Sequence, residues 1–306
     1  MRYATLYQIR EYLGYAASET SDDGRLTRLA GQTQADIDLF ARRTFAPLIA
    51  TRYFDFPIKR RGGLLGLFDP ELFVAQWSAV GDLNAGRLRL DADLLTATLV
   101  VNGDGTTVAA TDYVTGPPNL YPKSEIVLKT GSGLSWLPGA DGDREQVIAV
   151  TGQWGYHVNP SAMWVDTLDI LKAGVNAAAT TISVNDADGT PADLDPVRCQ
   201  SGNLIQIGTE WLDVIAVDTT LNTLTVLRGA QGSTAAAHDL GDKVYVFRPD
   251  ANVVLAHIRL TVWRYRQKDV DSFDKASILA NGVVTIPASF PEDVAALIPM
   301  YQRLDE

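Results

Sequence analysis

The spacing of apolar residues changes twice along this chain, and each change limits what the chain can fold into. Apolar residues recur at three-to-four spacing in the ranges 6–13 and 26–41, which predicts amphipathic helices. Between about 50 and 249 the spacing shortens to two, the period of half-buried strands. Helical spacing returns after Pro249, in the range 253–268. This order predicts an α+β fold in which helices from both ends of the chain meet in one helical core.

Start and stop signals delimit the N-terminal helices. Gly14 ends the first helix, and the polar run Ser18–Asp23 precedes the second. Pro47 closes the second helix, because proline interrupts helical hydrogen bonding. One face of this helix is expected to be buried, and it carries Leu26, Leu29, Ala30, Thr33, Ile37, Phe40 and Ala41.

The β-rich range divides into two parts with different character. In the first, a strand over Leu95–Val101 ends at Asn102–Gly105, a strong hairpin-turn signal. The second has about five short strands. We therefore expect residues 1–160 to hold the N-terminal helices and a β-rich segment, 161–249 an inserted antiparallel β module, and 250–306 a C-terminal helix and tail that complete the core.

Charge bears on which partners this chain can have. The 306 residues carry a net charge of −11, which does not suit a protein that coats nucleic acid with clustered lysine and arginine. The range 161–250 holds 12 acidic and 5 basic residues, a balance of −7, against −4 elsewhere. This concentration predicts a solvated outer module.

Composition also argues against several kinds of site. A single cysteine, Cys199, excludes an internal disulfide and a cysteine-based metal site. Three histidines far apart in sequence do not favour a multi-histidine metal centre. No apolar run reaches the ~18 residues that span a membrane, and no signal-peptide pattern follows Met1.

Motifs that resemble catalytic or ligand-binding loops lack their decisive residues. Asn102–Gly105 and Asp186–Gly189 echo the start of a calcium loop, but neither has the later glutamate that completes it. Gly62–Gly66 lacks the lysine of a phosphate loop, and Gly131–Gly133 lacks the context of a nucleophile elbow. His157 has no matching nucleophile, so we expect a structural histidine there. We expect no enzyme activity, no cofactor and no bound metal.

The only basic cluster is a candidate for partner contact. It consists of Lys59, Arg60 and Arg61, with Arg42, Arg43 and Arg52 nearby in sequence. Two interpretations stay open: a solvated loop, or an electrostatic contact with an acidic protein or a DNA backbone. The apolar run that follows is either buried core or a docking tongue, and its candidate contacts are Leu64, Leu65 and Phe68.

The order of several stretches resembles the head–tail connector, or adaptor, family of tailed bacteriophages. The likeness is carried by Tyr3–Gly14, by Asp22–Phe45, by Asp112–Val114 with Val150–Tyr156, and by Trp263–Arg266. The resemblance extends over about two-thirds of the chain, and these stretches, 50 of the 306 residues, are the parts that carry it. The run Leu204–His238 departs from the minimal family pattern and looks like a small β module embedded in phage structural proteins.

The resemblance implies a helical connector core and a structural role in the phage neck. It implies a dodecameric ring that docks under the portal protein, extends the DNA channel and provides a platform for a stopper or tail-completion protein. Genomic DNA would pass through the lumen without sequence-specific binding. The protein would be found in the virion at the head–tail interface, and in the host cytoplasm during assembly. The tail from Gly282 is the candidate for portal docking, with contacts at Val283, Ile286 and Tyr301.

Another class of function stays open beside the connector. The β module could make this a carbohydrate-binding or receptor-binding virion protein, with Trp154, Trp164 and Trp211 stacking on sugar rings. Tryptophans that occur singly are more often part of a core. Oligomeric order separates the two: a neck adaptor forms rings, whereas a receptor binder is typically a fibrous trimer.

Overall fold

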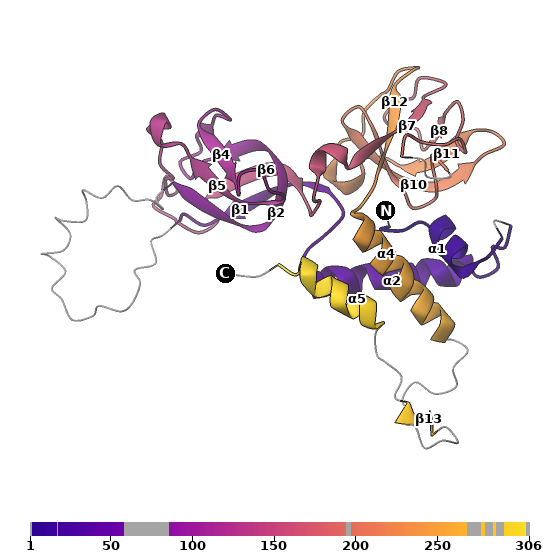
Figure 1. Cartoon of the computed structure of the whole chain (residues 1–306). Helices are drawn as coiled ribbons and strands as arrows, with labels where there is room; N and C mark the ends of the chain where they lie inside the picture. The colour runs from indigo at the N-terminus through magenta and orange to yellow at the C-terminus, as the bar shows by residue number, and fades with distance from the viewer. Residues whose placement is uncertain are drawn as a thin grey trace, which may run out of the picture. The chain divides into compact units, whose positions relative to one another are not determined.

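The chain forms two compact units (Figure 1). The computed structural model describes residues 2–16, 18–57, 86–193, 197–267, 277–278, 284–285 and 291–303. One unit combines Met1–Leu48 with Tyr156–Glu306, and the other is Ile49–Gly155. The predicted domain ranges 1–160, 161–249 and 250–306 stay predictions. The two compact units are defined by contacts in space, whereas the predicted ranges follow the order of the chain.

The predicted α+β fold built on a helical connector core is wrong, because the described chain is mostly β. Two antiparallel sheets of six strands each form its framework. The physical reason is that the period-two segments bury large apolar clusters of their own. The helices pack together around two further apolar clusters and do not form the framework.

The first sheet belongs to the unit Ile49–Gly155. Its strands are β1 (Leu48–Phe54), β2 (Arg87–Val101), β3 (Thr107–Val108), β4 (Tyr113–Gly116), β5 (Lys123–Leu128) and β6 (Ile148–Trp154). The order is β1-β6-β2-β5-β4, and β3 pairs with β2. The long strand β2 pairs with β5 along its first half and with β6 along its second. Register shifts along β2 let it serve both neighbours around a core that includes Trp136 and Trp154.

The second sheet lies in the other unit. Its strands are β7 (Trp164–Ile170), β8 (Thr181–Ser183), β9 (Leu204–Ile207), β10 (Glu210–Asp218), β11 (Thr223–Leu227) and β12 (Lys243–Phe247). The order is β7-β12-β9-β10-β11-β8. A bridge between Leu171 and Val184 joins the chain just beyond β7 to the chain just beyond β8. The sheet therefore closes on itself at that end, around a core rich in Val, Ile and Leu.

The helical cluster consists of four α-helices in the described residues: α1 (Leu6–Leu13), α2 (Asp23–Ala41), α4 (Ala251–Arg266) and α5 (Glu292–Leu297). The short 3₁₀ turn η5 (Ile298–Tyr301) follows α5. Helix α2 packs on α4, and α1 contacts both. As predicted, α2 buries Leu26 and Ile37, whereas Phe40 is 52% exposed. None of the described helices is both long and apolar enough to cross a membrane.

Local chemistry explains where these helices begin and end. Thr5 and Gln8 form a reciprocal capping box at the start of α1, and Gly14 ends that helix in the left-handed conformation with φ 78°. Asp250 accepts a hydrogen bond from the backbone N–H of Asn252 and so caps α4. These caps satisfy backbone groups that would otherwise lack partners.

Candidate functional site

Four aromatic rings join distant parts of the chain in the helical cluster. Phe45, just beyond α2, is at the centre, with ring centroids 5.8 Å from Tyr3, 5.4 Å from Tyr156 and 5.7 Å from Tyr301. All three pairs are edge-to-face, an arrangement in which the positive edge of one ring contacts the negative face of the other. This aromatic cluster connects the N-terminal segment, the end of α2, the second residue after β6 and the C-terminal segment.

Two predicted partner-contact residues belong to this aromatic cluster. The Tyr301 hydroxyl donates to Asp250 Oδ1 at 2.9 Å and accepts from Asn252 Nδ2 at 3.1 Å. Burial raises the pKa of Tyr301 to about 12, and the Asp250 carboxylate adds to the effect. The guanidinium carbon of Arg43 lies 4.6 Å from the centroid of the Tyr156 ring. Both side chains therefore make contacts within the chain.

The remaining partner-contact candidates fall into two groups. Arg42 is exposed at the C-cap of α2, where its backbone is left-handed with φ 50°. The basic loop, the apolar run and the tail candidates lie outside the described residues: Lys59, Arg60, Arg61, Leu64, Leu65, Phe68, Val283 and Ile286. The structure brings Arg43 and Tyr301 to one aromatic cluster and places Arg42 on the surface nearby in sequence.

A buried acid–phenol pair lies beside the aromatic cluster. The Tyr3 hydroxyl donates to Asp38 Oδ1 at 2.5 Å and accepts from the backbone N–H of Phe45 at 3.0 Å. Burial raises the pKa of Asp38 to about 6, although the Tyr3 hydrogen bond acts in the opposite direction. The pKa of Tyr3 is raised well above its ordinary value by burial and by Asp38. The pair anchors the N-terminal segment to α2.

A fully buried histidine links three segments of the same cluster. His257 Nδ1 accepts from the backbone N–H of Ala4 at 3.1 Å, and Nε2 lies 2.9 Å from the carbonyl oxygen of Ala30. These partners require the neutral tautomer with the proton on Nε2. Burial lowers the pKa of His257 to about 4. The ring therefore acts as a neutral hydrogen-bonding link between α4, α2 and the N-terminal segment.

The second sheet buries a charged group that the sequence analysis did not find. Glu210 is fully buried, and its carboxylate accepts from Arg228 Nε and Nη2, both at 2.7 Å. His238 Nε2 lies 2.8 Å away, and the backbone N–H groups of Gly229 and Ala236 donate at 3.0 Å. Burial alone would raise the pKa of Glu210, but these donors, Arg228 first, lower it to about 2.

Arg228 is satisfied on its other side as well. It donates to the carbonyl oxygens of Asn176 and Ala179 at 2.7 and 2.9 Å. Because every strong donor faces an acceptor, this group acts as a structural link that holds the loops after β7 and β11 against β10. The sequence signal was weak: an acid and an arginine 18 residues apart, each next to a strand end.

The turn motifs are satisfied within the chain. Asp104 Oδ1 accepts from the Thr106 backbone N–H and hydroxyl, which closes the turn after β2. The Asp186 carboxylate pairs with Arg198 at 3.0 Å. His157 is buried between the carbonyl of Arg248 and the N–H of Asn159, and burial lowers its pKa. In the described part of the chain, no three His, Cys, Asp or Glu side chains gather as a metal site would require.

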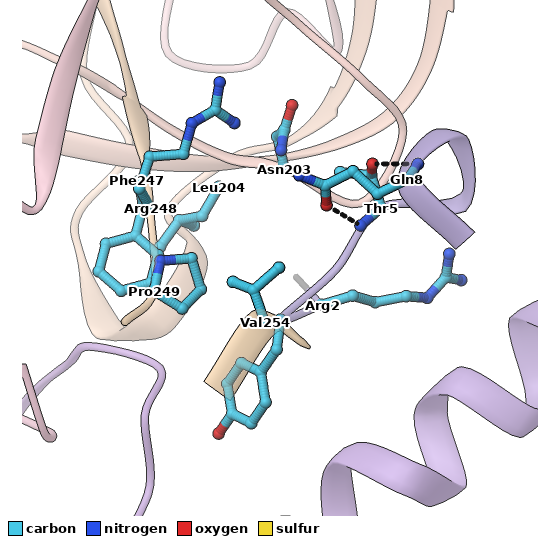
Figure 2. A pocket seen from close by; sticks show the side chains of 10 residues that line it. Arg2, Thr5, Gln8, Asn203, Leu204, Phe247, Arg248, Pro249 and Val254 are labelled. Atoms are coloured by element: carbon cyan, nitrogen blue, oxygen red, sulfur yellow. Dashed lines mark hydrogen bonds between the residues drawn. The ribbon is translucent and has the colours of Figure 1, made fainter. Parts of the chain in front are cut away.

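A narrow recess lies where the second sheet adjoins the helical cluster (Figure 2). It measures about 300 Å³, part of which is open to solvent. Arg2 and Arg248 both line it, but Figure 2 shows their guanidinium groups pointing in different directions. Two arginines that diverge do not form an anion clamp, so the recess gives no argument for an anion site.

The tryptophans offered as sugar platforms are mostly inside the protein. Trp154 and Trp211 are each 1% exposed, and Trp154 Nε1 donates to the carbonyl of Ala50 at 2.9 Å. Trp164 packs on Trp211 with centroids 5.3 Å apart.

No protein-family model matches this chain, and no curated protein matches it in sequence.

Proposed function

We propose that this chain is a structural protein of the tailed-phage neck that assembles with copies of itself into a ring. The ring would dock under the portal, extend the DNA channel and receive the stopper or tail-completion protein. The helices would serve this role as a cluster attached to a mostly β framework, and not as the framework itself. On this proposal the protein is located at the head–tail interface of the virion.

One observation carries the proposal: the stretches behind the resemblance to connectors meet in space. The Tyr265 hydroxyl donates to Asp22 and lies 3.0 Å from the Tyr15 hydroxyl. Arg264 pairs with Asp36. These contacts join the second stretch, Asp22–Phe45, to Trp263–Arg266, more than 200 residues away.

The third stretch reaches the same cluster. The backbone N–H of Tyr156 donates to the carbonyl of Thr44 at 2.8 Å, and its ring packs on Phe45. Residues that pack against one another limit each other's size and polarity. A sequence pattern that this chain has in common with connectors at such residues therefore supports a similar local structure in both. Of the third stretch only Tyr156 belongs to the unit that holds the helices; Asp112–Val114 and Val150–Gly155 lie in the other compact unit and add nothing to this argument.

The test is the assembly state of the purified full-length protein. We expect negative-stain images to show closed rings with a central channel, and sedimentation velocity to show a matching large species. A protein that stays monomeric at about 100 μM, well above the Kd range of typical stable assemblies, would overturn the proposal. A fibrous trimer would favour the receptor-binding class instead.

Docking to the portal has its own test in the tail. The double variant Val283→Asp and Ile286→Asp is expected to form rings that no longer attach to portals in a pull-down. Leu240→Asp serves as the control, since Leu240 is 69% exposed and lies outside the tail. If the double variant binds portals as well as the wild type does, the tail is not the docking element.

A further inference from the structure

Two exposed surfaces of the unit that contains the helices complement each other. The first is the outer face of α2, opposite the buried residues Leu26 and Ile37. Arg28, Ala35 and Leu39 lie on this face at positions i, i+7 and i+11, and all three are exposed. Leu39 is 72% exposed, an unusual degree for a leucine within a helix that has an apolar inner face. We call this surface the α2 outer face.

The exposed charged side chains of the α2 outer face are basic, whereas the three acids of α2 are half-buried and make contacts within the chain. Asp36 pairs with Arg264, Asp38 accepts from Tyr3, and Asp23 lies 3.5 Å from Arg10. Arg25 and Arg28 are both exposed, and within the described residues Arg28 makes no ion pair. The Arg25 guanidinium lies 5.9 Å from the centroid of the Tyr265 ring, so the apolar side chain of Leu39 shares its face with the unpaired guanidinium of Arg28.

The second surface is the β10–β11 hairpin, and it has the opposite charge. Ile215, Leu221 and Leu227 are 55%, 68% and 58% exposed. The hairpin also carries Asp213 and Asp218, and no lysine or arginine occurs from Trp211 to Leu227. We call this surface the hairpin face.

Strand pairing places the half-buried Asp213 and the exposed Leu227 on the side of the hairpin that faces away from the core. Asp213 is opposite Leu227, and their neighbours Val214 and Val226 point into the core. A bulge between Val214 and Ala216 inserts Ile215 as an extra residue next to this pair. Asp218 is exposed at the far end, where it also accepts the N–H groups of Thr220 and Leu221 in the turn.

We propose that the α2 outer face of one copy binds the hairpin face of a second copy. Burying the exposed leucines and isoleucine supplies the favourable free energy, and the opposite charges orient the two surfaces. Both surfaces belong to one compact unit and are exposed in a single chain, so they meet between copies and not within one. The inference rests on the proposed function, since it names the contact that would build the ring.

This contact has a consequence for symmetry. It joins two different surfaces, so it is heterologous, and each copy keeps one free surface of each kind after pairing. Repetition of such a contact generates a closed ring if the rotation closes, and a filament if it does not. A symmetric dimer, in which the same surface meets itself, is not a product of this contact.

Single substitutions test each face in the full-length protein by sedimentation velocity. Leu39→Asp and Leu227→Asp are each expected to weaken self-association about tenfold or more. In each variant a leucine that the contact would bury is replaced by a carboxylate that the contact would have to desolvate. Leu240→Asp is the matched control, since Leu240 is 69% exposed and lies outside both faces. Thermal unfolding of each variant shows that the fold is retained.

A mixing experiment tests that the contact is heterologous. The Leu39→Asp variant keeps its hairpin face, and the Leu227→Asp variant keeps its α2 outer face. An equimolar mixture is therefore expected to form heterodimers and nothing larger.

In a second variant pair, Arg28→Glu is expected to weaken assembly, and adding Asp218→Lys to it is expected to restore the lost affinity.

The outcomes separate this inference from the proposed function. If both leucine variants form the same rings as the wild type, the proposed contact is overturned, whereas the proposed ring is not. A mixture without heterodimers would overturn it as well. Wild-type protein that does not self-associate would overturn both, whereas loss of assembly in Leu39→Asp and Leu227→Asp but not in Leu240→Asp would support both.

Discussion

The helical cluster and the second sheet belong to the same compact unit, yet they bury polar groups in opposite ways. The sheet buries a charged carboxylate, Glu210, and surrounds it with Arg228, His238 and backbone donors. The helical cluster buries His257, which stays neutral, and half-buries Asp38, whose pKa is raised to about 6; each has few partners. A buried charge persists where donors converge on it, and otherwise burial shifts the pKa toward the neutral form.

The difference predicts how each region responds to change. The charged network depends on every partner being present, so it should be sensitive to single substitutions and insensitive to mild acid. His257 and Asp38 should tolerate conservative substitution. Their contributions to the free energy of unfolding should change with pH between the folded and unfolded pKa values of each group. The experiments that follow run from the largest expected effect to the smallest.

Arg228→Met would leave the Glu210 carboxylate buried without its cation. We expect a loss of about 3–5 kcal/mol in the free energy of unfolding, because breaking a buried pair strands one charge. Urea unfolding at pH 7 measures it. Lys243→Met in the same sheet is the control, since Lys243 is 62% exposed in its pair with Asp166 and should cost less than about 1 kcal/mol. Equal losses in the two variants would show that the Glu210 network is no stronger than a surface pair.

His257 should make the wild-type protein less stable as the pH falls. The folded pKa of about 4 lies below the unfolded value of 6.5, so the unfolded chain binds the proton first. Stability is therefore lost from about pH 6.5 downward, by up to about 3 kcal/mol. In His257→Gln this slope should disappear, which unfolding free energies at several pH values between 7 and 4 would reveal. An unchanged slope would mean that His257 is not the titrating group.

Asp38 should act in the opposite sense over part of that range. Its folded pKa of about 6 is above the unfolded value of 3.8, so its contribution is full below pH 3.8 and is lost as the pH rises through 6. Asp38→Asn should therefore gain about 1–2 kcal/mol relative to wild type between pH 4 and pH 8, a figure reduced for partial solvent exposure. The difference in unfolding free energy, followed against pH, tests this; a difference that does not rise with pH would contradict it.

Tyr301→Phe should have the smallest effect, about 1 kcal/mol, because it removes the hydrogen bonds to Asp250 and Asn252 but keeps the ring contacts. Thermal unfolding measures the change. If Tyr301 contributes within the chain alone, the variant should also assemble like the wild type. A normal melting temperature combined with lost assembly would instead make Tyr301 a contact with a partner.

Sequence patterns predicted the elements of this chain better than their assembly. The helix from Leu26, the turn at Asn102–Gly105 and the strand Lys243–Phe247 are confirmed, because each depends on residues close in sequence. The framework was predicted wrongly as a helical core. Counting periods shows which elements form, but it does not show which of them contribute most to the buried core.

The candidate site shows the same division. Tyr301 was predicted as a contact with a partner, which stays a prediction; the structure shows its contacts with Phe45 and Asp250 within the chain. The acidic range 161–250 was expected to be solvated, yet Glu210 and Asp169 are buried. A local pattern cannot separate these two acids from their exposed neighbours, because their donors come from other loops.

The sequence by itself determined the local structure: where helices start, where turns fall and which face of each element is apolar. These features depend on backbone geometry and on neighbours within a few residues. Only the tertiary structure decided that Glu210 meets Arg228, that His257 joins three segments, and that the sheets form the framework. Those outcomes depend on loop closure over tens to hundreds of residues, and many different pairings share the same local pattern.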